Sequence, residues 1–134
     1  MTAWGGPGQG TVNDLPGNQW RSYLNTADHP EYPSGSATFC AAHAQAARRF
    51  LGTDNVQLFF PVAAGSSRIE PGITPATNLL LSWTTWTDFA RDCGMSRLWG
   101  GVHFKASITN GAAFGGQFGD MAYEFVQRHI NGQS

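Results

Sequence analysis

Charged side chains are scarce in this sequence of 134 residues. Asp, Glu, Lys and Arg make up 13% of it, whereas about 25% is usual in soluble domains. The formal net charge is −1, so the chain lacks the basic surface that attracts nucleic acid or anionic membranes, and we expect neither as a partner. With so few charges on the outside, we expect another chain or another copy to cover part of the surface. A neutral surface rich in Gly and Ser is the alternative.

Long hydrophobic runs are also absent. Apolar runs such as the one at residues 79–81 are much shorter than a membrane span. The N-terminus is rich in Gly and Pro and has no apolar segment typical of a signal peptide. We therefore expect a soluble chain without a transmembrane segment, and the sequence leaves its compartment open.

Cysteine is nearly absent. Cys40 and Cys93 are the two in the chain, and their spacing is unlike the C-x-x-C pairs that bind metals. We interpret them as two small buried thiols, with a disulfide as the alternative.

Residues 1–33 contain neither a helical nor a strand period. Repeated Gly and Pro residues interrupt this segment, which predicts a long extended arm, followed by a helical half-domain over residues 34–134. The arm is expected to lie on a surface, because it carries aromatic side chains that are scarce in disordered tails. These are Trp4, Trp20, Tyr23 and Tyr32.

The rest of the chain is expected to be mainly α-helical, without strand pairing. Apolar periodicity predicts helices over residues 36–51, 79–92, 95–104 and 110–130. Ser36 is the expected N-cap of the first helix, and Gly94 is expected to end the second. Gly100 and Gly101 interrupt the third. Residues 53–77 are expected to form a long loop with one short extended piece.

A stripe of glycines marks the last helix. Gly111, Gly115 and Gly119 fall four residues apart, and each costs a solvent-exposed helix about 1 kcal/mol relative to Ala. This cost is understandable if the stripe touches the backbone of another helix.

The segment Pro33-Ser34-Gly35-Ser36 precedes the first helix. Free N–H groups at a helix start, the helix dipole and serine hydroxyls together form a cradle for an anion. An ordinary Ser cap after a Pro turn is the alternative interpretation.

A second segment, residues 96–104, carries Arg97 and His103. Six residues separate them, so an unbroken helix would not place them on one face. The two glycines between them break the helix, and the side chains could then converge. An Arg and a neutral His that meet on a tetrahedral anion could stabilise its charge and supply a ligand or nucleophile. An exposed Arg and a core His are the alternative.

Together, the segments 29–35 and 93–104 resemble the C-terminal half of vanadium-dependent haloperoxidases. The wider superfamily includes the type 2 phosphatidic acid phosphatases. The resemblance covers about residues 20–130, and the second segment matches in order, spacing and flanking glycines. It implies a mainly α fold, a partial helical bundle of the haloperoxidase and phosphatidic acid phosphatase type.

The resemblance also implies roles for individual residues. Ser34 and the backbone of Gly35 would donate to the equatorial oxygens of vanadate or phosphate, and Arg97 would balance the charge of the anion. His103 would be the apical ligand of vanadium, or the phosphorylated nucleophile of a phosphatase. With vanadate as cofactor and peroxide as oxidant, such an enzyme would oxidise a halide.

Three departures from the family pattern weaken the expectation of activity. Ser36 replaces the acid/base His, a loss that typically costs roughly 10²–10⁴-fold in rate. Residues 1–33 contain no match to the Lys and Arg of the family's upstream helix, and Ser107 replaces the Asp that often orients the nucleophilic His. With Arg97 as its one motif cation, the chain alone is expected to bind vanadate weakly.

The sequence therefore favours an oxyanion-binding domain that is a fragment or split subunit of a haloperoxidase-like oxidoreductase. Another protein chain, or a further copy, would complete its bundle. One alternative is a catalytically degenerate structural or interaction subunit that retains the fold. Another is an acid-phosphatase-like hydrolase of phosphoric esters. Whether any activity remains is left open.

Overall fold

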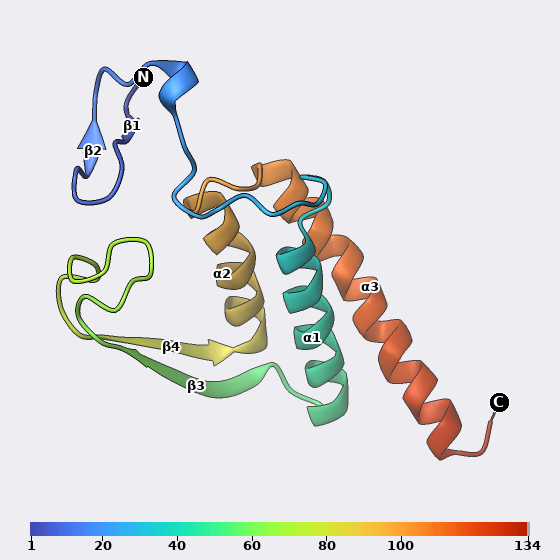
Figure 1. The fold of residues 1–134 in the computed structure, drawn as a ribbon. Coiled ribbons are helices and arrows are strands. Elements are labelled where there is room, and N and C mark those ends of the chain that lie inside the picture. Colours follow the sequence, from blue (N-terminus) through green and yellow to red (C-terminus); the bar gives the residue numbers. More distant parts are fainter. Residues whose placement is uncertain (134) are drawn as a thin grey trace.

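Three helices packed side by side form the body of the chain. The computed structural model describes residues 1–133. The helices are α1 (Gly35–Leu51), α2 (Trp86–Trp99) and α3 (Lys105–Ile130). Because α2 runs opposite to the other two, the start of α1, the end of α2 and the start of α3 meet at one end of the bundle (Figure 1). None of the helices described is long and apolar enough to cross a membrane.

The predicted glycine contact between helices is confirmed. The stripe on α3 is buried and lies against Ser34, Thr38 and Ala42 at the start and along one side of α1. A Cβ atom added at Gly115 would collide with the backbone of Thr38. Glycine therefore lets the two helix backbones approach more closely than any other residue would allow.

Much of the sequence that joins α1 to α2 forms a β-hairpin, so the predicted helix over residues 79–92 is wrong for residues 79–85 and confirmed for residues 86–92. The strands β3 (Asn55–Val62) and β4 (Leu79–Thr85) are antiparallel, with Phe59 opposite Ser82. The apolar run that begins β4 fits a helix and a strand equally well, and pairing with a distant segment decides between them. Two neighbouring strands also contradict the expectation of a chain without strand pairing.

The start and the end of α2 also differ from the prediction. Thr85 ends β4, and its hydroxyl accepts a hydrogen bond of 3.0 Å from the Asp88 N–H, which caps α2. The helix then continues through Gly94 instead of ending there. A Cβ atom at Gly94 would lie 3.1 Å from Ile108 Cγ2, so this glycine serves close packing between helices. Gly101, with a φ of 73°, lies in the turn that follows α2.

The separate helix predicted over residues 95–104 does not form. Its first part belongs to α2, and α3 begins at Lys105 instead of the predicted residue 110. Phe104 is the N-cap residue of α3, with an extended backbone and no side-chain hydrogen bond to the helix. The cap therefore lacks the Ser, Thr, Asn or Asp that marks most helix starts in a sequence.

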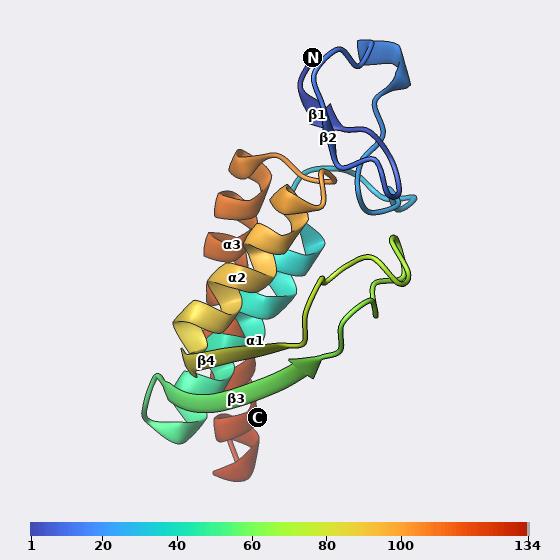
Figure 2. The ribbon, with the colours of Figure 1, turned by 90° about the vertical axis from the view of Figure 1, so that its left-hand side faces the viewer.

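The first part of residues 1–33 folds into a small unit, and the rest runs without helix or strand to the start of α1, so the segment is not a uniformly extended arm. The strands β1 (Ala3–Trp4) and β2 (Thr11–Val12) pair, and the 3₁₀ helix η1 (Gly17–Gln19) follows. Figure 2 shows this unit beside the loop that joins β3 to β4. In that loop, the buried carboxylate of Glu70 accepts hydrogen bonds from Gly8 N at 3.1 Å and from the Tyr23 hydroxyl at 3.2 Å. The N-terminal unit thus lies on another part of the chain, as its aromatic content predicts.

Candidate functional site

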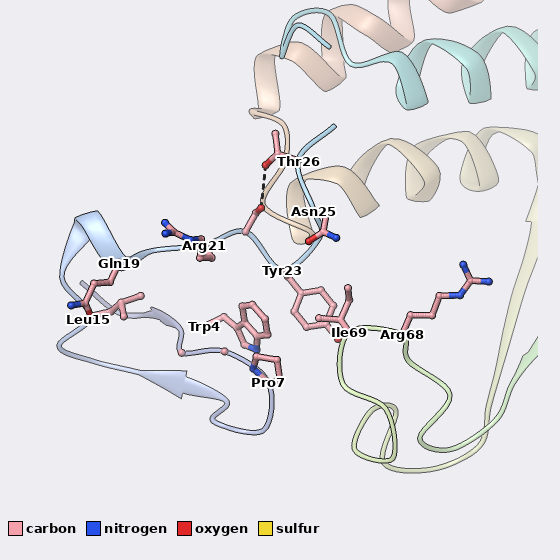
Figure 3. Close-up of a pocket in the computed structure, with 13 residues that line it drawn as sticks. Trp4, Pro7, Leu15, Gln19, Arg21, Tyr23, Asn25, Thr26, Arg68 and Ile69 are labelled. Atoms are coloured by element: carbon pink, nitrogen blue, oxygen red, sulfur yellow. Dashed lines mark hydrogen bonds between the residues drawn. The ribbon is translucent and has the colours of Figure 1, made fainter. Parts of the chain in front are cut away.

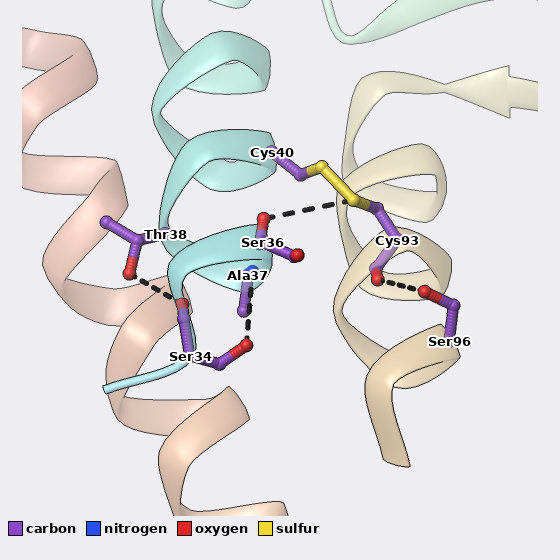
Figure 4. The surroundings of a disulfide bond; sticks show 7 residues. All are labelled: Ser34, Ser36, Ala37, Thr38, Cys40, Cys93 and Ser96. Carbon is purple, nitrogen blue, oxygen red and sulfur yellow. Dashed lines mark hydrogen bonds between the residues drawn. A yellow bond between two sulfur atoms is a disulfide. The ribbon is translucent and has the colours of Figure 1, made fainter. Parts of the chain in front are cut away.

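The start of α1 is capped by Ser34, which corrects the prediction of Ser36 as the cap. Ser34 is fully buried, and its Oγ accepts a hydrogen bond of 3.4 Å from Ala37 N (Figure 4). Its backbone N–H donates to the Ser107 carbonyl at 3.1 Å. The Ser34 hydroxyl therefore serves as the cap of α1 and lies beneath the surface of the site.

Gly35 and Ser36 form the first turn of α1 and face an open space. Their N–H groups have no partner within the helix, and the helix dipole adds positive potential at this end. Both residues line a cavity of about 420 Å³, together with His29. A Cβ atom at Gly35 would meet nothing within 4 Å, so a ligand can approach the backbone there.

Arg97 and His103 lie together in a second, smaller cavity of about 90 Å³. Arg97 is on the last turn of α2, and His103 follows the turn at Gly100 and Gly101. The two side chains therefore converge across the glycine break, as expected. His29 lines this cavity as well, and its ring stacks on that of His103 with centroids 5.8 Å apart.

The structure thus brings all five predicted residues to one end of the bundle, where four of them line two neighbouring cavities and the fully buried Ser34 lines neither. Gly35 and Ser36 line one, and Arg97 and His103 line the other. The His29 side chain stands at the boundary between the two cavities.

A backbone carbonyl fixes the orientation of the His103 ring. The Nδ1 atom of His103 lies 2.6 Å from the Glu31 carbonyl oxygen. A carbonyl can only accept, so Nδ1 carries the proton and Nε2 keeps a free lone pair when the ring is neutral. The side chain of His103 is 2% exposed. A buried imidazole with a free Nε2 is suited to bind a metal oxyanion or to attack phosphorus.

Glu31 is a site residue that the sequence interpretation missed. Its carboxylate accepts a hydrogen bond of 2.8 Å from Phe104 N, and Oε1 lies 3.4 Å from His103 Nδ1. Hydrogen bonds from the Ser107 side chain and from Phe104 N lower the pKa of Glu31 below its ordinary value. In the family pattern, a single Asp often orients the nucleophilic His. In this chain, Ser107 replaces that Asp in the sequence, and Glu31 contacts the His103 ring. The one available signal was an acidic residue three positions before Ser34.

Arg97 has a buried donor without an acceptor. Its Nε atom is inaccessible to solvent and has no hydrogen-bond partner within residues 1–133. None of the ion pairs found in the same part of the chain includes Arg97. A buried N–H group without an acceptor is costly, and an anion bound in the cavity could supply that acceptor.

A disulfide joins the two helices that carry the site. Cys40 on α1 and Cys93 on α2 are bonded, with Cα atoms 6.4 Å apart (Figure 4). The interpretation of two free thiols is therefore wrong, since the antiparallel packing of α1 and α2 brings the cysteines together. Cys93 is one helical turn before Arg97, and Cys40 is one turn after Ser36. The bond thus ties the two halves of the candidate site to each other.

Other predicted features lie away from this end of the bundle. His43 packs edge-on against Trp86, with ring centroids 5.4 Å apart, so it does not replace the missing acid/base His. In the part of the chain that the structure describes, no three His, Cys, Asp or Glu residues gather as a metal site would require.

Comparison with known proteins yields a family and a fold. The family model described as VCPO second helical-bundle domain matches residues 1–132. A crystal structure of apo-type bacterial vanadium-dependent chloroperoxidase is 52% identical and superposes with a TM-score of 0.94, over 98% of this chain and 28% of the other. The holo-type structure of a bacterial vanadium-dependent chloroperoxidase gives 52% identity and a TM-score of 0.93, over 97% and 27%. The chain thus spans less than a third of these proteins. Among curated proteins, no sequence matches it.

Proposed function

Because the chain belongs to the vanadium-dependent chloroperoxidase family, as its second helical-bundle domain, we propose that it supplies one side of a vanadate site. The observation that carries this proposal is the pairing of Arg97 and His103 in one small cavity. The buried Nε of Arg97 lacks an acceptor, and the Nε2 of His103 is free because Nδ1 is engaged.

The residues present fit one side of a tetrahedral oxyanion. The start of α1 offers backbone donors at Gly35 and Ser36, and the cavity beside it offers the guanidinium of Arg97 and the imidazoles of His103 and His29, next to the Glu31 carboxylate. An oxyanion of charge −2 or more needs further cations when it is buried. The shortage of cations agrees with a domain that covers less than a third of the length of its solved relatives.

Each residue has a role that follows from its contacts. Arg97 would donate to the anion and offset its charge, and Gly35 N–H would bind an equatorial oxygen. His103 would hold the central atom through Nε2, kept in that direction by the Glu31 carbonyl. Bound vanadate supplies the chemistry by which peroxide oxidises a halide. The disulfide between Cys40 and Cys93 would keep the two halves of the site at a fixed separation.

A further segment would complete the bundle and add the missing cations. Large apolar side chains remain exposed along one helix, namely Phe114, Phe118, Met121, Phe125, Val126 and Ile130 of α3. The hairpin exposes others, including Phe59, Phe60 and Leu80, each by about three-fifths. Apolar area of this extent is unusual for a monomer and indicates a covered face. The covering segment can belong to the same polypeptide, to another protein chain or to a second copy.

Ser36 supports a second candidate, a domain that keeps the fold without full activity. The hydroxyl of Ser cannot act as an acid or base near neutral pH as the family His does. In that case, the chain would bind an oxyanion and accelerate halide oxidation weakly or not at all. The same argument applies to hydrolysis of phosphoric esters, which also needs an acid for the leaving group.

Bromide oxidation by peroxide, with added vanadate, tests the proposal in the intact protein that carries this chain. Activity is expected in the wild type and is expected to fall at least about 100-fold in His103→Ala and Arg97→Ala. His129→Ala and Arg128→Ala are matched controls at the far end of α3 and should leave activity unchanged. Activity that survives His103→Ala would overturn the site. Inactive wild type that still binds vanadate would favour the degenerate domain.

A further inference from the structure

A third cavity opens beside the oxyanion site, between the N-terminal unit and the loop that joins β3 to β4 (Figure 3). It has a volume of about 520 Å³, which is within the range of about 300–1,000 Å³ for small-molecule sites. Trp4 and Tyr23 provide aromatic surface, and Ile69 adds apolar surface beside them. The cavity therefore has the size and the lining of a site for an organic molecule.

The aromatic wall of this cavity is held in place by buried hydrogen bonds. The Trp4 and Tyr23 rings meet edge to face, with centroids 5.0 Å apart. Behind them, the Glu70 carboxylate accepts from Trp4 Nε1 at 3.4 Å and from the Tyr23 hydroxyl at 3.2 Å. Glu70 is 6% exposed. The rings are thus fixed before a ligand arrives, which lowers the entropy that binding would cost.

The charged side chains that line this cavity are both basic, while the Glu70 carboxylate lies behind the aromatic rings. Arg21 and Arg68 belong to its lining, and no Asp or Glu does among residues 1–133. Figure 3 shows the two guanidinium groups on opposite sides of the aromatic pair. The Arg21 Nη1 atom donates to the Trp20 carbonyl at 3.1 Å. Neither arginine takes part in an ion pair within the described chain.

Thr26 connects this cavity to the candidate oxyanion site. It lines the large cavity with Trp4 and Tyr23, and it also lines the small one with Arg97 and His103. The two cavities therefore adjoin each other at Thr26.

We propose that this third cavity binds an organic anion, with an aromatic or other flat apolar body on Trp4 and Tyr23 and its anionic group near Arg21 or Arg68. Such a molecule would be the halogen acceptor, an assignment that rests on the proposed function. Hypohalous acid made at the neighbouring site would react with an electron-rich carbon of this acceptor. The carbon–halogen bond forms as the oxygen–halogen bond breaks, and the proton released from carbon joins hydroxide as water.

Direct binding of two probes tests the cavity without any need for activity. Equilibrium dialysis of the intact protein, without vanadate, would compare 2-naphthoate with neutral 2-naphthylmethanol and with acetate. Naphthoate is expected to bind more tightly than the neutral alcohol, because charge-assisted hydrogen bonds to Arg are stronger than neutral ones. Acetate, which has no ring, is expected not to bind measurably.

Variants then separate this cavity from the rest of the surface. The double variant Arg21→Gln/Arg68→Gln is expected to weaken naphthoate binding by at least about tenfold and to leave the alcohol nearly unchanged. Arg128→Gln, on the exposed end of α3, is the matched control and should change neither. Equal losses for both probes, or no naphthoate binding by the wild type, would overturn the proposal. Since the assay lacks vanadate and peroxide, failure of the proposed function would leave this result untouched.

Discussion

The imidazole Nδ1 of His103 lies 2.6 Å from the backbone carbonyl oxygen of Glu31, a residue 72 positions earlier in the chain. This contact fixes the tautomer of a buried histidine through a backbone carbonyl, which any residue at position 31 would provide. It also joins the turn after α2 to the segment before α1, so the two motif segments are held together by a bond between them.

The contact predicts that neutral His103 carries its proton on Nδ1. Long-range ¹H–¹⁵N correlation spectra of the intact protein at neutral pH are expected to show an unprotonated Nε2. Glu31→Gln is expected to leave this tautomer unchanged, because the carbonyl remains. An Nε2-protonated ring in the wild type would contradict the proposed direction of the lone pair.

The disulfide predicts that the denatured protein contains no free thiols before reduction. It closes a loop of 53 residues between Cys40 and Cys93, for which loop entropy predicts a stabilisation of about 4 kcal/mol. Urea unfolding of Cys40→Ala/Cys93→Ala is therefore expected to show a loss of about 2–4 kcal/mol. Two titratable thiols in the unreduced wild type would show that the bond is absent.

The glycine stripe predicts opposite effects at two adjacent positions. A Cβ atom at Gly115 would collide with the Thr38 carbonyl, whereas one at Gly116 would meet nothing within 4 Å. Gly115→Ala is expected to lower the free energy of unfolding by about 1–3 kcal/mol through overpacking. Gly116→Ala is the matched control and is expected to raise it by about 0.5–1 kcal/mol, because Ala favours helix. Equal effects at both positions, measured by urea unfolding, would rule out close contact of α1 and α3.

Glu70 predicts a dependence of stability on pH. The hydrogen bond from Gly8 N, aided by those from Trp4, Tyr23 and Thr74, lowers the pKa of Glu70 below its ordinary value of 4.5. A carboxylate with a lowered pKa stabilises the folded state above the unfolded pKa, and this contribution disappears as pH falls through the folded value. Glu70→Gln is therefore expected to have a lower melting temperature than the wild type at pH 7, and the difference is expected to shrink below about pH 4.5.

Glu124→Gln serves as the control for this experiment, since the Glu124 side chain is 57% exposed. A pH-independent difference between wild type and Glu70→Gln would mean that the charge of Glu70 does not hold the N-terminal unit. The protection of the Gly8 N–H against hydrogen exchange, relative to an unfolded peptide at the same pH, should decrease over the same pH range.

Local sequence patterns predicted the parts of the fold that local forces decide. The small residues of α1 repeat at helical spacing, and the glycines of α3 fall four apart, so both helices and their close contact could be predicted. The site residues were recognisable because Ser34, Arg97 and His103 stand in short segments with a known chemical purpose. Their convergence also depends on the turn at Gly100 and Gly101, which the sequence shows directly.

The features that escaped prediction depend on partners far along the chain. The run at Leu79, Leu80 and Leu81 becomes a strand because β3 pairs with it, and pairing leaves no local mark. Cys40 and Cys93 could be matched only when the antiparallel course of α1 and α2 was known. Glu31 acts on His103 mainly through its backbone, which no side-chain pattern can reveal.

Binding of vanadate to the intact protein tests the central claim most directly, because it does not require turnover. Equilibrium dialysis of vanadate would compare the wild type with Arg97→Ala, His103→Ala and the control Arg128→Ala. The account predicts saturable binding by the wild type and the control, competition by phosphate, and affinities at least roughly tenfold weaker in the two site variants. Equal vanadate affinity in the wild type, Arg97→Ala and His103→Ala would contradict it.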